Sequence, residues 1–211
     1  MIRKEIGLDQ FYTPQATADW AVKVIRDQPW WIDIVEAIEP TAGKGVFLNA
    51  LKPYEHYMTV HSFDLEPKHP DVIQKDTFEV DVPALLYHPK KKQQIPRDHV
   101  LLIGNPPFGR QSKLAREIWD HYSDHVGYTA FIVPRSMAIP KFMSKSRTIP
   151  KNHDLLFTLS MPSDLFELPD GKTKSIKGVA LLVTRHISLR DQKANPVSIR
   201  GDDWEQYADT E

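Results

Sequence analysis

A short apolar run followed by two consecutive prolines is the feature that most constrains how this chain can fold. The run Val100–Ile103 is β-branched and aliphatic, which is typical of a fully buried strand. Pro106 and Pro107 can neither continue a strand ladder nor lie inside a helix, so the chain must leave the sheet in an extended shape. The Asn105 carboxamide and the Phe108 ring are therefore displayed at the carboxyl end of a buried strand, where open α/β sheets bind ligands.

This arrangement suits a planar amino group attached to a ring. The Asn105 side-chain oxygen and the Pro106 carbonyl can each accept one N–H hydrogen bond, while Phe108 can stack on the ring. Two acceptors draw the lone pair of the amino nitrogen out of conjugation and make that nitrogen more nucleophilic. The alternative interpretation of the same residues is an Asn-Pro-Pro turn that only closes a strand.

Length and composition limit the classes of protein to which the chain can belong. Its 211 residues are enough for one α/β domain with a sizeable core. The absence of cysteine excludes disulfides, zinc–thiolate sites and thiol catalysis. The net charge of −1 means that any surface for nucleic acid must be a local cluster of basic residues. No apolar run approaches ~18 residues and no hydrophobic signal region is present, so we expect an intracellular, cytoplasmic protein without a membrane.

A second strand, expected over Ile34–Ile38, runs into a loop with two glycines, Gly43 and Gly45. A strand, a small-residue loop and a helix start form the unit in which a ligand can approach the backbone. The loop matches neither a P-loop nor a Gly-x-Gly-x-x-Gly pattern. Glu39, at the end of the strand, can bind an ammonium group or order water beside one.

Acidic residues also end the next two expected strands. Asp64 closes the strand Val60–Glu66, 25 residues after Glu39, where a carboxylate can bind the hydroxyls of a ribose. Asp76 follows a short strand and can accept a hydrogen bond from an adenine amine, while Phe78 can cover the ring. Each could singly be a surface acid or a core aromatic, but three acids at three successive strand ends favour a nucleoside-containing cofactor.

The rest of the chain gives an outline of helices, strands and basic loops. Thr13 is expected to be the N-cap and Pro14 the first residue of a helix that ends near Asp27, and Ser112 is expected to cap a second helix. Residues 79–99 are expected to be irregular. Further strands are predicted over Tyr128–Val133, Leu155–Ser160 and Val179–Thr184, and two basic loops, at 138–153 and 171–177, carry Lys145, Arg147, Lys172 and Lys174.

Taken together, these motifs resemble the amino-methyltransferases that use S-adenosylmethionine, specifically the adenine-N6 group with an Asn-Pro-Pro-Phe/Tyr motif. The resemblance covers about residues 9–185. It implies a single Rossmann-like class I methyltransferase domain of the α/β class, with a mostly parallel seven-stranded sheet and a C-terminal antiparallel hairpin. We therefore expect that domain over residues 1–186 and a polar tail, of no assigned structure, over 187–211.

The resemblance also implies roles for individual residues. The catalytic motif is Asn105, Pro106, Pro107 and Phe108. S-adenosyl-L-methionine would be bound by an N-terminal closing element, by the glycine loop, and by the ribose and adenine motifs: Tyr12, Thr13, Pro14, Glu39, Pro40, Thr41, Ala42, Gly43, Gly45, Phe47, Asp64, Leu65, Asp76 and Phe78. The nucleic-acid substrate would be contacted by Lys145, Arg147, Lys172 and Lys174, and no metal is expected.

The expected reaction is methyl transfer to the N6 amine of adenine in nucleic acid, with DNA ahead of RNA. Relatives that methylate duplex DNA at defined sites usually carry a separate target-recognition domain, and no segment here is long enough to form one. A partner protein is therefore a candidate source of target recognition. Two alternatives remain open: methylation of a glutamine amide in a protein, and a catalytically silent methyltransferase fold that serves as a subunit.

Overall fold

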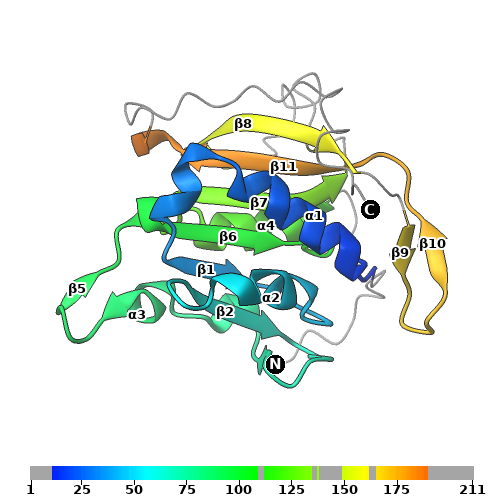
Figure 1. Cartoon of the computed structure of the whole chain (residues 1–211), viewed down its shortest axis with the longest axis horizontal. Coiled ribbons are helices and arrows are strands. Elements are labelled where there is room, and N and C mark those ends of the chain that lie inside the picture. The colour runs from blue at the N-terminus through cyan, green and yellow to red at the C-terminus, as the bar shows by residue number, and fades with distance from the viewer. Residues whose placement is uncertain (1–10, 109–111, 135–136, 138–148, 162–164, 190–211) are drawn as a thin grey trace.

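The computed structural model places seven strands in one sheet, in the order β3-β2-β1-β6-β7-β11-β8 (Figure 1). It describes residues 11–108, 112–134, 137, 149–161 and 165–189. The parallel part of the sheet consists of β3 (Ile73–Gln74), β2 (Thr59–Asp64), β1 (Glu36–Glu39), β6 (Val100–Gly104) and β7 (Tyr128–Pro134).

Strand β11 (Val179–His186) runs antiparallel to both β7 and β8 (His153–Ser160). The predicted fold class, a mostly parallel seven-stranded α/β sheet with an antiparallel hairpin at its end, is confirmed. The central position of β6 explains its composition, since all five of its residues are buried.

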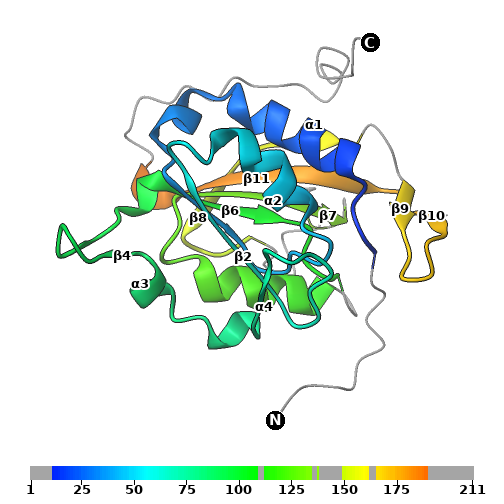
Figure 2. The ribbon, with the colours of Figure 1, turned by 60° about the horizontal axis from the view of Figure 1, so that its bottom comes forward.

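Helices cover both faces of the sheet (Figure 2). Helix α1 (Gln15–Arg26), the 3₁₀ helix η1 (Pro29–Asp33) and α2 (Val46–Leu51) pack on one face, where Trp20, Trp30 and Phe47 enter the larger core. Helix α4 (Lys113–Tyr122) packs on the other face through Ile118 and Trp119. The two cores therefore lie on opposite faces of the sheet, and loops lie at its edges.

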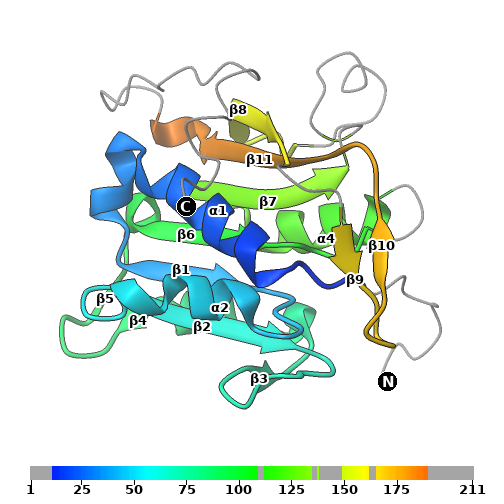
Figure 3. The ribbon, with the colours of Figure 1, turned by 45° about the vertical axis from the view of Figure 1, so that its right-hand side comes forward.

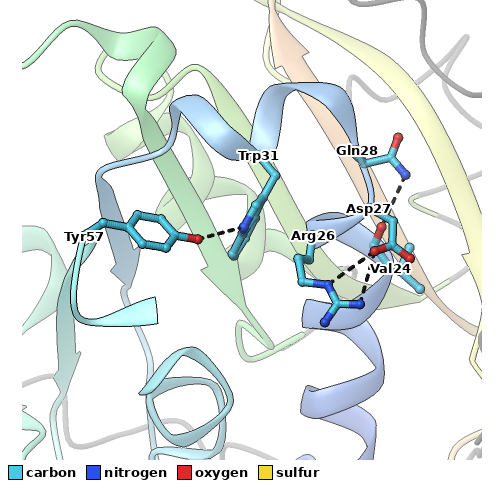
Figure 4. A network of polar contacts seen from close by, with 6 residues as sticks. All are labelled: Val24, Arg26, Asp27, Gln28, Trp31 and Tyr57. Atoms are coloured by element: carbon cyan, nitrogen blue, oxygen red, sulfur yellow. Dashed lines mark hydrogen bonds and ion pairs between the residues drawn. The ribbon is translucent and has the colours of Figure 1, made fainter. Parts of the chain in front are cut away.

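A polar network fixes the corner where α1 turns into β1 (Figure 4). The Trp31 indole N–H donates to the Tyr57 hydroxyl at 3.0 Å, and the Gln28 amide donates to the Val24 carbonyl at 3.3 Å. Because this corner lies at the amino end of β1, the beginning of α1 lies at the opposite, carboxyl edge of the sheet. That places residues 11–14 beside the Asn-Pro-Pro-Phe segment.

The expectation of irregular chain over residues 79–99 is wrong. This stretch contains α3 (Val82–Leu85), the hairpin strands β4 (Tyr87–His88) and β5 (Gln93–Gln94), and the 3₁₀ helix η4 (Arg97–His99). Another 3₁₀ helix, η3 (Thr77–Glu79), leads into it. Asp81 starts α3 because its carboxylate accepts the Ala84 N–H at 3.0 Å, a local cap signal that the sequence did contain.

Of the two predicted helix caps, that of Thr13 is wrong, whereas Ser112 is the N-cap residue of α4 but makes no capping bond with its side chain. Pro14 itself is the N-cap of α1, and no side chain caps that helix, because residues 11–13 are held in an extended segment and Thr13 lies one residue too early. Ser112 precedes α4 but has the left-handed conformation (φ 54°), in which its hydroxyl makes no capping bond. An N-cap side chain reaches the helix N–H groups from the extended region of φ/ψ instead.

Parts of the chain named above lie outside the described residues. They include most of the first basic loop, with Lys145 and Arg147, and the tail beyond Leu189; before it, Ile187–Leu189 form the 3₁₀ helix η6. In the described ranges, no helix has the length and apolar character needed to cross a bilayer. Within those same ranges, no cluster of three or more His, Asp or Glu side chains gathers for a metal ion.

Candidate active site

The Asn105 side chain is held in one orientation at the carboxyl end of β6. Its Nδ2 donates to the Phe11 carbonyl at 3.2 Å, a bond that only the NH2 end of the amide can make. The Oδ1 atom is consequently directed away from Phe11; it is buried and has no hydrogen-bond partner among the described residues. A buried amide oxygen without a donor is costly, so its presence points to a ligand N–H.

The remaining residues of the motif are buried or half-buried. Pro106 is buried, and Phe108 is half-buried and packs against the core on the α1 side of the sheet. Gly104 has φ 148°, and a Cβ there would lie 3.6 Å from the Glu39 side chain. The structure therefore brings the Asn-Pro-Pro-Phe segment next to the end of β1.

The glycine loop between β1 and α2 is covered by two aromatic rings. Gly43 and Gly45 both have positive φ, 52° and 69°. A Cβ at Gly43 would lie 3.1 Å from the Tyr12 ring, and one at Gly45 would lie 2.8 Å from His69. A side chain at either position would therefore be strained. The Thr41 hydroxyl in this loop is buried and lacks a partner in the described parts of the chain.

Glu39 lies beneath the loop and is 1% exposed. Burial raises the pKa of its carboxyl to about 8; hydrogen bonds from the Ser62 hydroxyl and from the backbone N–H groups of Leu48 and Phe47 oppose that rise. The Ser62 bond is 3.1 Å long. Glu39 thus ties β1 to β2 and to the start of α2, and direct contact with a cofactor ammonium group stays a prediction.

The Asp64 carboxylate connects two segments of backbone at the end of β2. One oxygen accepts the Gly43 N–H at 2.7 Å, and the other accepts the Glu66 N–H at 2.8 Å. Each carboxylate oxygen can accept a second hydrogen bond, and Asp64 is half-buried, so it can still receive a hydroxyl group. Leu65 next to it is exposed and can cover a flat ligand.

Asp76 and Phe78 lie after β3, at the start of η3. Asp76 Oδ1 accepts the Phe78 N–H at 3.0 Å, which makes Asp76 the cap of this 3₁₀ helix. Phe78 is half-buried and meets His121 edge-on, with ring centroids 5.8 Å apart. Both side chains are therefore fixed in place at the predicted edge of the sheet.

A strap, which we define as Phe11–Thr13, crosses the site and joins it to the hairpin of β9 (Leu165–Glu167) and β10 (Thr173–Ser175) (Figure 3). Tyr12 and Glu167 exchange two backbone hydrogen bonds of 2.8 Å. Burial and the nearby Asp64 charge raise the pKa of Tyr12, while Lys44 lowers it. The strap therefore lies directly over the glycine loop.

Several residues of this site were not predicted from the sequence. Glu167 forms an ion pair with Lys44, and Lys44 Nζ lies 5.0 Å from the centroid of the Tyr12 ring. Lys44 lies between the two glycines, so its place in the loop could have been predicted from the sequence. No local pattern marked Glu167. His69 and Ser62 were also missed, because their roles depend on packing across the sheet.

The two basic side chains of the second loop have different surroundings. Lys174 Nζ lies 5.0 Å from the centroid of the Phe11 ring, so this lysine reaches the rim of the site. Lys172 is exposed and pairs with Asp170 at 3.0 Å, near the tip of the hairpin. Of these two predicted nucleic-acid contacts, Lys174 therefore lies at the rim of the site and Lys172 near the tip of the hairpin.

Besides the amide oxygen of Asn105, two buried hydroxyl groups indicate where a ligand would lie. Thr13 Oγ1 and Thr41 Oγ1 lack hydrogen-bond partners within the described ranges. Thr13 ends the strap, Thr41 follows β1, and Asn105 follows the neighbouring β6, whose register places Ile38 opposite Leu102. All three groups lie at one edge of the sheet, so the site fits a polar, nucleoside-containing cofactor.

Three solved structures with a similar fold are described as methyltransferases. A candidate RNA methyltransferase from Pyrococcus horikoshii superposes with a TM-score of 0.57 at 15% identity, over 89% of this chain and 92% of the other. The methyltransferase subunit of a type I restriction-modification system from Streptococcus thermophilus gives 0.52 at 15% identity, over 83% of this chain. A candidate class I S-adenosylmethionine-dependent methyltransferase from Listeria monocytogenes gives 0.51, also at 15% identity, over 88% of this chain.

The chain spans 45% of the Streptococcus subunit and 64% of the Listeria protein. At the level of sequence, no protein-family model matches the chain, and neither does any curated protein. At 15% identity, what the chain shares with these structures is the fold. The fold is that of class I S-adenosylmethionine-dependent methyltransferases.

Proposed function

We propose that the protein transfers a methyl group from S-adenosyl-L-methionine to the N6 amine of adenine in nucleic acid, with DNA ahead of RNA. The observation that carries this proposal is the Asn105 carboxamide. Its NH2 end is bound to the Phe11 carbonyl and its buried oxygen has no donor among the described residues, so it is ready to accept an N–H from outside the chain.

The cofactor would be held by the groups that the sheet edge gathers. Asp64 would accept the ribose hydroxyls, Asp76 the adenine amine, and the Thr13 and Thr41 hydroxyls would bond the polar methionine end. Glu39 would act from below by fixing the loop, because Ser62 and the start of α2 already bond its carboxyl. When bound, S-adenosylmethionine supplies a methyl group activated by a sulfonium leaving group.

The residues of the chain would prepare the target amine for attack. Asn105 Oδ1 and the Pro106 carbonyl would accept the two N6 hydrogens, while Phe108 stacks on the base. Both acceptors bind more strongly as the nitrogen becomes tetrahedral and positively charged, so they stabilise the transition state more than the ground state. The target nitrogen would gain the methyl group as the bond of that group to sulfur breaks, and the surplus N6 proton would pass to water.

The nucleic-acid part of the proposal rests on the basic side chains near this rim and on the fold. Lys174 lies over Phe11, next to the segment that holds Asn105, and Lys172 lies further out on the same hairpin. Lys145 and Arg147 are proposed contacts outside the described residues. A partner protein would supply target recognition where a defined sequence is methylated.

The experiment is methyl transfer from labelled S-adenosylmethionine to plasmid DNA, tRNA, rRNA and a glutamine-containing peptide, with wild type and Asn105→Ala. We expect N6-methyladenine in a nucleic acid, and a loss of ~10²–10³ in rate in the variant with cofactor affinity retained. Asn152→Ala is the matched control, because Asn152 bonds Asp124 at the other end of the sheet. Labelling of the peptide alone, or wild-type turnover by Asn105→Ala, would refute the proposal.

A further inference from the structure

The Asn105 amide can serve as an acceptor only if its orientation is fixed. A carboxamide that rotates by half a turn presents its NH2 group, which repels an incoming amine instead of binding it. The bond that prevents this rotation is made by the Phe11 carbonyl, a main-chain group 94 residues away in sequence. Whatever holds Phe11 in place therefore also sets the orientation of the amide.

Glu167 is the residue that holds the strap, and it does so twice. Its backbone N–H and C=O both bond Tyr12, at 2.8 Å each. Its carboxylate pairs with Lys44 of the glycine loop, 123 residues earlier, and Lys44 in turn lies over the Tyr12 ring. Because Tyr12 follows Phe11 directly, these contacts restrain the position of the Phe11 carbonyl.

We propose that Glu167 is a positioning residue, which acts through Tyr12 and the Phe11 carbonyl to keep the Asn105 oxygen facing the substrate amine. This inference rests on the proposed function. It gives the β9–β10 hairpin a second role besides contact with nucleic acid, namely to pair with the strap. It also links the cofactor loop to the substrate side, since Lys44 belongs to that loop.

The test compares Glu167→Gln and Lys44→Met, each of which removes one charge of the ion pair, with Asp170→Asn. Asp170 is the matched control, because it belongs to the same hairpin and pairs with a lysine, but at the exposed tip and away from the strap. The readout independent of activity is the ¹⁵N NMR signal of the Asn105 side-chain NH2, identified by its loss in Asn105→Ala.

In Glu167→Gln and in Lys44→Met, we expect the NH2 signal to move toward that of a free amide and its hydrogens to exchange at least about tenfold faster. The kcat on the best substrate should fall about tenfold, while KM for S-adenosylmethionine changes little, because a misoriented acceptor affects the transition state most. The double variant should be no worse than Lys44→Met, since that variant already removes both the ion pair and the contact of Lys44 with the Tyr12 ring.

An unchanged Asn105 signal and unchanged kcat in both variants would overturn the proposal, as would an equal effect in Asp170→Asn. If one variant does not fold, the other breaks the same ion pair from the opposite side. The NMR result stands even if no nucleic acid is methylated. Failure of the proposed function and failure of this inference are therefore distinguishable.

Discussion

The Asp64 carboxylate accepts the backbone N–H of Gly43 at 2.7 Å and so joins the end of β2 to the glycine loop after β1. One carboxylate thereby shapes the loop and remains available for a ligand hydroxyl. This double role differs from that of Glu39, whose carboxyl is buried and bonded by the Ser62 hydroxyl and by backbone N–H groups at the start of α2. The two acids at neighbouring strand ends thus act at different depths of one site.

Replacing Asp64 by Ala should weaken binding of S-adenosylmethionine by about one to two decades. The variant loses a charge-assisted bond to the ribose, of ~1.5–3 kcal/mol, and the bond that holds Gly43. Isothermal calorimetry measures the change in Kd. Asp71→Ala, at an exposed acid between β2 and β3, should leave the affinity unchanged, and an unchanged Kd in Asp64→Ala would remove Asp64 from the cofactor site.

The pH dependence of stability should carry a contribution from Glu39. Its folded-state pKa of about 8 lies above the ordinary 4.5, so the folded protein binds this proton more tightly than the unfolded chain. The resulting stabilisation is fully present below pH 4.5 and is lost as the pH rises through 8. Urea unfolding of wild type and Glu39→Gln should show a smaller decrease over this range in the variant; identical slopes would contradict the raised pKa.

His153 should contribute with the opposite sign. Burial lowers the pKa of this imidazole to about 4, and the backbone contact with the Ser123 carbonyl only partly opposes that shift. The unfolded chain therefore takes up the proton first, and stability is lost as the pH falls from 6.5 to about 4. His153→Gln should lose less stability than wild type over this window, whereas His56→Gln, at an exposed site, should follow the wild type.

Nucleic-acid affinity should depend steeply on salt, because each phosphate contact contributes a slope of ~0.7–0.9 in log K against log salt. Replacing both Lys172 and Lys174 by Met should lower the affinity and reduce this slope. Lys90 and Lys91, exposed in the turn of the β4–β5 hairpin, offer a control pair with the same change in charge. Equal binding by the two double variants, measured by fluorescence anisotropy, would argue against the β9–β10 hairpin as a contact surface.

The elements whose cause is local follow from the order of residues alone. The apolar run before Asn105 and the two prolines after it require a buried strand that ends in a carboxamide where the chain leaves the sheet. The small-residue loop with Gly43 and Gly45 marks a strand-to-helix turn, and the structure places the acids Asp64 and Asp76 at strand ends as predicted. These features depend on backbone dihedrals and on burial over a few residues, which the order of residues fixes.

How these elements act on one another depends on contacts between residues that are far apart in the sequence. The capping role expected of Thr13 is wrong, because the strap is held in an extended form by Glu167, far along the chain. The same pairing fixes the Asn105 amide through Phe11, and Ser62 on the neighbouring strand bonds Glu39. Such contacts depend on which strands are neighbours and in which register they pair, and a single sequence carries no local signal for either.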